Sequence, residues 1–356
     1  NGQPDAGRQY LPVGFNASQR LAAGCAAPGC DKVFWEDLSR CTGCGAALYC
    51  GKEHQHVDRP AHKEACSGIK KATLAYQEAE RQLREEKGDD ILGDGPPHFW
   101  GIQETRPYIR ARLALAEALL LVDTEGAVAL ALKHLLAMLH LCRSDNMGVR
   151  DLVPALYLRL GRDQEAYDFC KWWVTTAQEG DYDWGNRSSR FLHVKDPKDF
   201  VREASTSLAF AVSVTLIKIR LLIDLQALMR DRGIASPKLP SEIIDQSKVH
   251  CASSIILGQR HVLERDDQTS NITAQRRHIK QLFEAARDSN KHFWPALVRV
   301  GDELETRRMM DGFGGTGQMQ MPAAQRYHHL WAETEGAIGV IEELLGSYTD
   351  GMSDWA

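Results

Sequence analysis

The chain has 356 residues, of which 43% are hydrophobic and 26% charged, a composition typical of globular proteins with two or three cores. No apolar run is long enough to cross a bilayer, so we expect no membrane span. The net charge is −5 and no basic stretch stands out, which argues against a nucleic-acid partner.

The cysteines are concentrated in one short segment. Six of the nine lie between Cys25 and Cys66. A protein held together by disulfides would carry cysteines along its whole length, whereas one dense module beside a large remainder favours a metal site in a reducing compartment. We therefore expect an intracellular protein, in the cytoplasm, the nucleus or both.

The first 68 residues divide into two parts. Residues 1–20 are polar and contain several glycines and prolines, so we expect a flexible N-terminal tail. Residues 21–68 hold eight potential zinc ligands with the spacing C-x4-C-x10-C-x2-C-x5-C-x3-H-x7-H-x3-C. These ligands are Cys25, Cys30, Cys41, Cys44, Cys50, His54, His62 and Cys66.

The number and spacing of the ligands favour two structural zinc sites. Structural zinc takes four nitrogen or sulfur ligands, so eight ligands fill two sites and leave no open position for catalysis. The separations in Cys50-x3-His54 and His62-x3-Cys66 place each pair on one face of a helical turn. His56 is the alternative to His54. A redox role for the Cys41-x2-Cys44 pair is disfavoured, because no βαβ pattern surrounds it.

The segment "LYCGKEHQHVDRPAHKEAC" resembles the second half of a MYND-type zinc finger, whose pattern is Y-C-x3-C-Q-x3-W-x2-H-K-x2-C. The matching residues are Tyr49, Cys50, Gln55, His62, Lys63 and Cys66. The earlier cysteines match the two preceding cysteine pairs of that family. Two positions differ: His54 stands in place of a cysteine, and Arg59 in place of a tryptophan.

The resemblance implies a cross-braced finger with two structural Zn²⁺ ions. The first zinc would be held by Cys25, Cys30, Cys50 and His54, and the second by Cys41, Cys44, His62 and Cys66. It also implies a protein partner, such as a proline-containing peptide segment, contacted by Tyr49, Gln55 and Arg59. Since the tryptophan helps to build the peptide groove in related fingers, Arg59 leaves two alternatives: loss of peptide binding, or recognition of acidic segments.

Helical patterns follow the finger. Residues 69–103 are expected to form a helix and a linker that is broken by glycines and a proline pair. The apolar stripe of this helix is predicted at Ala72, Leu74, Ala75, Ala79 and Leu83.

Residues 104–309 are expected to form a helical body, and the predicted fold class is mainly α. Its first helices are predicted at 106–122, 126–142, 147–160 and 163–177, as two hairpins 35 to 38 residues apart. This stretch resembles tetratricopeptide-like proteins, including fungal proteins that carry a MYND finger, which implies a right-handed helical stack with a concave ligand face. The alternative is an irregular α-bundle.

Further helices are predicted at 198–231, 239–258 and 274–301, followed by a Gly/Met-rich loop at 310–322 and a C-terminal helix and tail at 323–356. Three aromatic groups are candidates either for the packed core or for a binding groove. They lie at Lys171–Trp173, Tyr182–Trp184 and His292–Leu297.

No motif in the chain predicts catalysis. The glycine-rich "GFGGTG" at 312–317 follows no predicted strand and lacks the Lys-Ser/Thr of a phosphate-binding loop. A SET-type methyltransferase is disfavoured, because the Asn-His pair is absent and the body is helical rather than β. We therefore predict a non-catalytic protein–protein interaction adaptor or regulator. The alternative is an enzyme whose active site lies unrecognised in the helical body.

Overall fold

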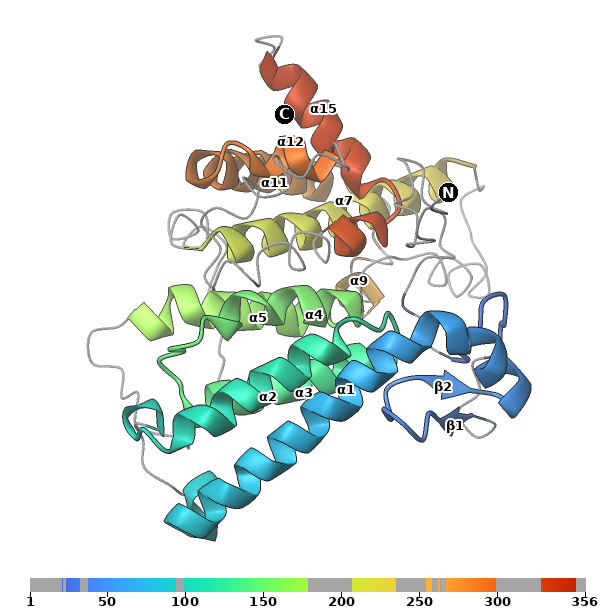
Figure 1. Cartoon of the computed structure of the whole chain (residues 1–356). Helices are drawn as coiled ribbons and strands as arrows, with labels where there is room; N and C mark the ends of the chain where they lie inside the picture. Colours follow the sequence, from blue (N-terminus) through green and yellow to red (C-terminus); the bar gives the residue numbers. More distant parts are fainter. Residues whose placement is uncertain are drawn as a thin grey trace, which may run out of the picture. The chain divides into compact units, whose positions relative to one another are not determined.

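The computed structural model describes residues 21, 24–32, 38–93, 99–178, 207–234, 254–257, 262, 265, 267–298 and 328–349. These residues are mainly helical, with one two-stranded antiparallel sheet near the N-terminus (Figure 1). They divide into two compact units. The finger unit contains the described residues up to Leu160, and the C-terminal unit contains those from Gly161 onward. The expected body at 104–309 is therefore divided at Gly161.

The small sheet forms a hairpin in the finger. Strand β1 (Ser39–Arg40) pairs with β2 (Leu48–Tyr49), with Ser39 opposite Tyr49. The intervening turn is closed by the Gly45 amide, which donates to the Cys41 carbonyl at 2.8 Å. Gly45 has φ 68°, a conformation that favours glycine.

One continuous helix, α1 (Lys52–Lys87), carries the last three zinc-ligand candidates and then extends away from the finger (Figure 1). The boundary expected between residues 68 and 69 therefore falls inside a helix. The helix ends at Gly88, which has φ 85° and whose amide donates to the Arg84 carbonyl at 2.8 Å.

The buried face of α1 differs from the predicted stripe. His62, Cys66, Ile69 and Leu83 are buried, whereas Leu74 is 58% exposed. Steps of three and four residues lead from the two zinc-ligand candidates to Ile69 and on to Leu83, so they share one face. The prediction of Leu74 in the stripe was wrong, because five residues from Ile69 rotate it to another side of the helix.

Two further helices confirm the helices expected at 106–122 and 126–142. They are α2 (Thr105–Leu119) and α3 (Glu125–Leu141), joined by a short turn and packed side by side, with α2 also packed on α1 (Figure 1). The helix expected at 147–160 is divided into a 3₁₀ turn, η5 (Val149–Asp151), and a short helix, α4 (Val153–Arg159). Further 3₁₀ turns are η3 (Asp89–Leu92), η4 (Phe99–Gly101) and η6 (Thr176–Gln178).

The C-terminal unit is built around a long buried helix. Its elements are α5 (Asp163–Val174), α7 (Leu208–Ile234), α9 (Ser254–Leu257), α11 (Thr269–Ser289), α12 (Phe293–Val298) and α15 (Ala337–Thr349). Helix α7 packs against α5, α11 and α15. A buried ion pair links Arg220 of α7 to Asp163 of α5 at 2.5 Å, and Arg220 also donates to the Thr334 hydroxyl at 2.9 Å.

Two predicted helices of this unit are interrupted. The helix expected at 274–301 breaks at Asn290, whose backbone is extended and whose side-chain oxygen accepts from the His292 amide at 2.9 Å. The C-terminal helix breaks at Gly336, which has φ 81°. Of the helix expected at 239–258, the structure describes only Ser254–Leu257, and the expected loop at 310–322 lies outside the described residues.

Two of the three aromatic groups belong to the packed core. Trp172 and Trp173 are at most 4% exposed, and Phe293 and Trp294 are fully buried. The Trp294 indole stacks on Phe283 at 5.4 Å and donates to its carbonyl at 2.9 Å. The Tyr182–Trp184 group lies outside the described residues. No helix in the described part of the chain combines the length and apolarity that a membrane span requires.

Candidate metal centre

The first cluster of donor atoms combines two separate parts of the finger. Cys25 and Cys30 come from the N-terminal loop, Cys50 follows β2 two residues before α1, and His54 lies in the first turn of α1; all four donor atoms lie within 4.8 Å of one another. His54 Nδ1 lies 3.1 Å from Cys50 Sγ and 3.5 Å from Cys25 Sγ. The Sγ atoms of Cys30 and Cys50 are 3.8 Å apart.

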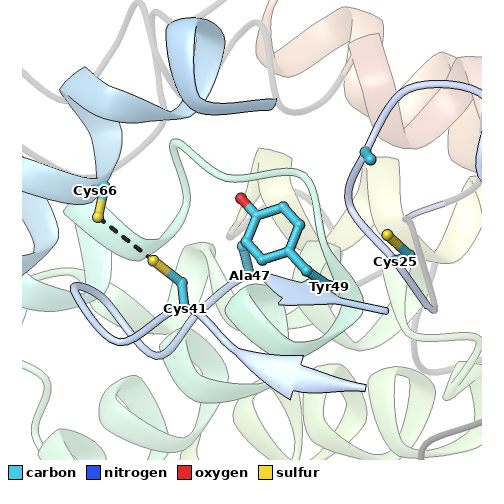
Figure 2. Packing of buried hydrophobic residues seen from close by; sticks show 6 residues of the cluster. Cys25, Cys41, Ala47, Tyr49 and Cys66 are labelled. Carbon is cyan, nitrogen blue, oxygen red and sulfur yellow. Dashed lines mark hydrogen bonds between the residues drawn. The ribbon is translucent and has the colours of Figure 1, made fainter. Parts of the chain in front are cut away.

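The second cluster joins the β1–β2 turn to the middle of the same helix. It contains Cys41, Cys44, His62 and Cys66, again with all donor atoms within 4.8 Å. The Sγ atoms of Cys41 and Cys66 are 3.7 Å apart, as drawn in Figure 2, and Cys44 Sγ lies 3.3 Å from His62 Nε2. The structure therefore brings together the same two sets of four that the MYND resemblance implied.

Both clusters fit structural Zn²⁺. A zinc–sulfur bond of about 2.3 Å in a tetrahedron separates two sulfurs by about 3.8 Å. The observed separations of 3.8 Å and 3.7 Å match this edge and far exceed the roughly 2.05 Å of a disulfide. Three sulfurs and one imidazole nitrogen per cluster complete each tetrahedron, so two structural zinc ions are accommodated.

The backbone of the turn is shaped around the sulfurs of the second cluster. The Ala46 amide donates to Cys44 Sγ at 3.4 Å. At Gly43, a Cβ would lie 2.7 Å from Cys66 Sγ, closer than real Cβ contacts allow. Only glycine therefore lets the turn approach this ligand, which is a packing requirement rather than a conformational one.

The local environment favours the thiolate form of Cys25 in the first cluster and of Cys41 and Cys44 in the second. Burial raises the pKa of Cys41, but hydrogen bonds from the Cys44 and Gly43 amides and from His62 outweigh it and lower the pKa to about 6. For Cys25, burial is likewise outweighed by the Cys50 and Ala27 amides and by His54, and the pKa falls to about 7. Because the thiolate is the form that binds zinc, these amides prepare the ligands for the metal.

The remaining residues singled out by sequence have different positions. Tyr49 is 2% exposed, and its hydroxyl donates to Asp58 at 2.7 Å. Figure 2 shows its ring beside Ala47, with Cys41 and Cys66 on one side and Cys25 on the other. Tyr49 is thus part of the finger's small core, and its expected contact with a partner is corrected, since its ring and hydroxyl are both used internally.

The other residues singled out by sequence are Gln55, Arg59 and His56. Gln55 is half-buried and follows the first-cluster donor His54, yet its side-chain nitrogen lies 3.8 Å from Cys41 Sγ of the second cluster. Arg59 is exposed on α1 and is free to meet a partner. His56 is exposed and lies outside both donor clusters, which favours His54 as the ligand.

Sequence reasoning missed the residue that attaches the finger to the helices. Thr124 is the N-cap of α3: its hydroxyl accepts from the Ala127 amide at 3.2 Å and donates to the Ala46 carbonyl at 2.9 Å. A Cβ at Gly126 would lie 3.5 Å from the same carbonyl. The turn that carries Cys44 is therefore packed directly on the start of α3. A sequence can indicate that a threonine caps a helix, but it does not indicate that this threonine also bonds to the Ala46 carbonyl, 78 positions away.

Comparison with known proteins supports the geometry. Residues 25–66 match the protein-family model described as MYND finger. The match begins and ends at zinc-ligand candidates of the two clusters and confirms the resemblance for this part of the chain. The Rho GTPase-activating protein gacZ of Dictyostelium discoideum is 42% identical over 62 residues, which are 17% of this chain and 6% of that protein. No solved structure matched the chain.

Proposed function

We propose that the MYND finger is a zinc-dependent protein-interaction module, and that the protein acts through it as a non-catalytic adaptor or regulator. The observation that carries this proposal is the family match over residues 25–66, together with two donor clusters of four ligands each. Four protein ligands close a tetrahedral site and leave no position for a substrate, so the zinc ions have a structural role.

The recognition surface that we propose lies on the exposed side of the first turns of α1. Val57 is 64% exposed, and Pro60 and Ala61, three and four positions further, are also exposed. Such residues form one apolar strip on a helix, whereas the exposed Arg59 cation lies on another face of the same turns, two residues after Val57 and one before Pro60. A partner segment that contacts both the strip and Arg59 would combine apolar or proline residues with an acidic side chain.

The helical body would provide a second contact surface. The α2–α3 hairpin, which packs beside α1, supports the tetratricopeptide-like stack as a proposal, while the short α4 and the unit boundary at Gly161 limit its extent.

The similarity to gacZ does not extend the proposal to a GTPase-activating function, because it covers only 6% of that protein. None of the described cysteines forms a disulfide, which supports a reducing compartment, the cytoplasm or the nucleus.

The test is a peptide-array screen with the zinc-loaded full chain, followed by affinity measurement for the peptides that bind. We expect apolar or proline-containing peptides with an acidic residue, and at least about tenfold weaker binding by Arg59→Glu because the cation becomes an anion. Lys70→Glu, an equal charge change at an exposed position of α1 beyond both ligand clusters, is the matched control. Equal binding by both variants, or a screen without specific peptides, would contradict the proposal.

A further inference from the structure

The two zinc-ligand clusters differ in how far their sulfurs are open to solvent. In the first cluster, Cys25 is 4% exposed, whereas Cys30 and Cys50 are both half-buried. In the second cluster, Cys41 and Cys66 are at most 5% exposed, and only Cys44 is half-buried. Of the two clusters, the first is therefore the one in which a small reagent from solvent can reach two sulfurs.

The chain around these two sulfurs also has room to move. Cys30 follows Gly29, Cys50 precedes Gly51, and both glycines are exposed. An added Cβ at either glycine would meet no atom within 4 Å, so neither segment is packed against a neighbour there. The turn of the second cluster, by contrast, is fixed to the start of α3 through its hydrogen bond to Thr124.

Hydrogen bonds to sulfur differ between the clusters in the same direction. The Ala46 amide donates to Cys44 Sγ at 3.4 Å, and the Gln55 side-chain nitrogen lies 3.8 Å from Cys41 Sγ. Such N–H groups stabilise a thiolate and make it a weaker nucleophile. Among the described residues, the two half-buried sulfurs of the first cluster have hydrogen-bond contacts only with donors of their own cluster.

We propose that Cys30 and Cys50 form a peroxide-sensitive pair, whose oxidation to a disulfide releases the first zinc ion. One thiolate attacks hydrogen peroxide, the O–O bond breaks, the sulfur takes one OH group and hydroxide leaves. The second thiolate then displaces hydroxide from that sulfur, so two electrons pass from the pair to the peroxide. The Sγ atoms, 3.8 Å apart, approach to about 2.05 Å. Cys25 and His54 remain, and two ligands do not hold a structural zinc ion.

The consequence for partner binding rests on the proposed function. Loss of the first zinc ion would separate the N-terminal loop from the helical turn that precedes Val57, where the proposed recognition strip begins. The oxidation itself depends only on the zinc sites, so its test is independent of the partner.

The experiment treats the zinc-loaded full chain with increasing hydrogen peroxide beside a chromogenic zinc indicator, then alkylates the free thiols and locates disulfides by mass spectrometry. We expect one zinc ion per chain to be released at least about tenfold faster than the other, because oxidation follows the exposure of the thiolate. The accompanying disulfide should join Cys30 to Cys50, and reductant with added zinc should restore the lost ion. Equal release of both ions, release without a disulfide, or a first disulfide between any other pair of cysteines would overturn the proposal.

Variants identify the pair. Cys30→His keeps a zinc-binding nitrogen but cannot form the disulfide, so we expect two bound zinc ions and about tenfold slower release of the faster one. Cys50→His should behave in the same way, and it replaces Cys30→His if elemental analysis finds fewer than two zinc ions in that variant. Cys142→Ser, the control, removes a thiol outside both clusters and should change neither rate. A histidine variant that binds two zinc ions and releases one at the wild-type rate would contradict the proposal.

Discussion

At the scale of single residues, Gly43 brings the backbone of the β1–β2 turn close to the zinc-ligand candidate Cys66. The change Gly43→Ala would place a methyl group 2.7 Å from Cys66 Sγ, so either the turn or the ligand must move. We expect weaker zinc binding at the second cluster, measured as faster transfer of one of two zinc ions to a chromogenic chelator. The control is Gly51→Ala, where no atom lies within 4 Å of the added methyl. Equal zinc transfer from both variants would show that the turn adapts without cost.

The residues of the site differ in how far sequence could predict them. The eight ligand candidates follow from local spacing and from the family resemblance, because Cys50 and His54, like His62 and Cys66, are four positions apart. The roles of Gly43 and Thr124 depend on segments that approach only in three dimensions, so no local pattern indicates them. Tyr49 matched the family motif, but a motif alone does not separate a core residue from a contact residue.

His134 of α3 gives the finger unit a predicted dependence on pH. Burial, followed by the charges of Arg112 and Lys133, lowers its pKa to about 4, and its ring packs edge-on against Tyr76 at 5.5 Å. Since the unfolded chain binds this proton near pH 6.5, the contribution to stability is complete above pH 6.5 and is lost as the pH falls towards 4. Solvent screens the half-buried ring, so we expect about 1–2 kcal/mol.

The variant His134→Phe tests this contribution, because it keeps an aromatic ring beside Tyr76 and removes the titrating group. Chemical unfolding at several pH values should show the variant gaining stability relative to the wild type as the pH falls from 6.5 to 4. The comparison at equal pH cancels the effect of acid on the zinc sites, which both proteins share. A constant difference between the two proteins across this range would contradict the prediction.

At the scale of elements, Thr124 connects the finger to α3 and caps that helix at the same time. Thr124→Val keeps the shape but removes both hydrogen bonds, leaving the Ala46 carbonyl and the Ala127 amide without them. We expect a loss of about 2–3 kcal/mol in the unfolding free energy of the finger unit, because buried polar groups lose their partners. Thermal unfolding measures this loss. Thr73→Val, which removes only a bond to the Ile69 carbonyl within α1, is the matched control and should cost much less.

The helices were predicted better than their ends. The periodic apolar pattern placed α2 and α3 to within a few residues, since packing and periodicity agree there. The start of α1 was missed because charged residues and Pro60 conceal a helix whose buried face begins with zinc ligands. The break at Asn290 was missed because it depends on a side-chain bond to the His292 amide rather than on a proline or glycine.

At the scale of the whole molecule, zinc is expected to stabilise more than the finger. The ligands His62 and Cys66 share a helix face with Ile69 and Leu83, and the turn of the second cluster is packed on α3. Zinc removal should therefore loosen α1 and the start of α3, because metal binding and folding are coupled in small metal-bound modules. The C-terminal unit has a core of its own around α7 and Trp294 and should keep its protection. Hydrogen exchange with and without a chelator distinguishes the two units. Faster exchange confined to residues 24–66 would mean that the finger unfolds alone, whereas equal loss of protection in α7 would mean that the two units unfold as one.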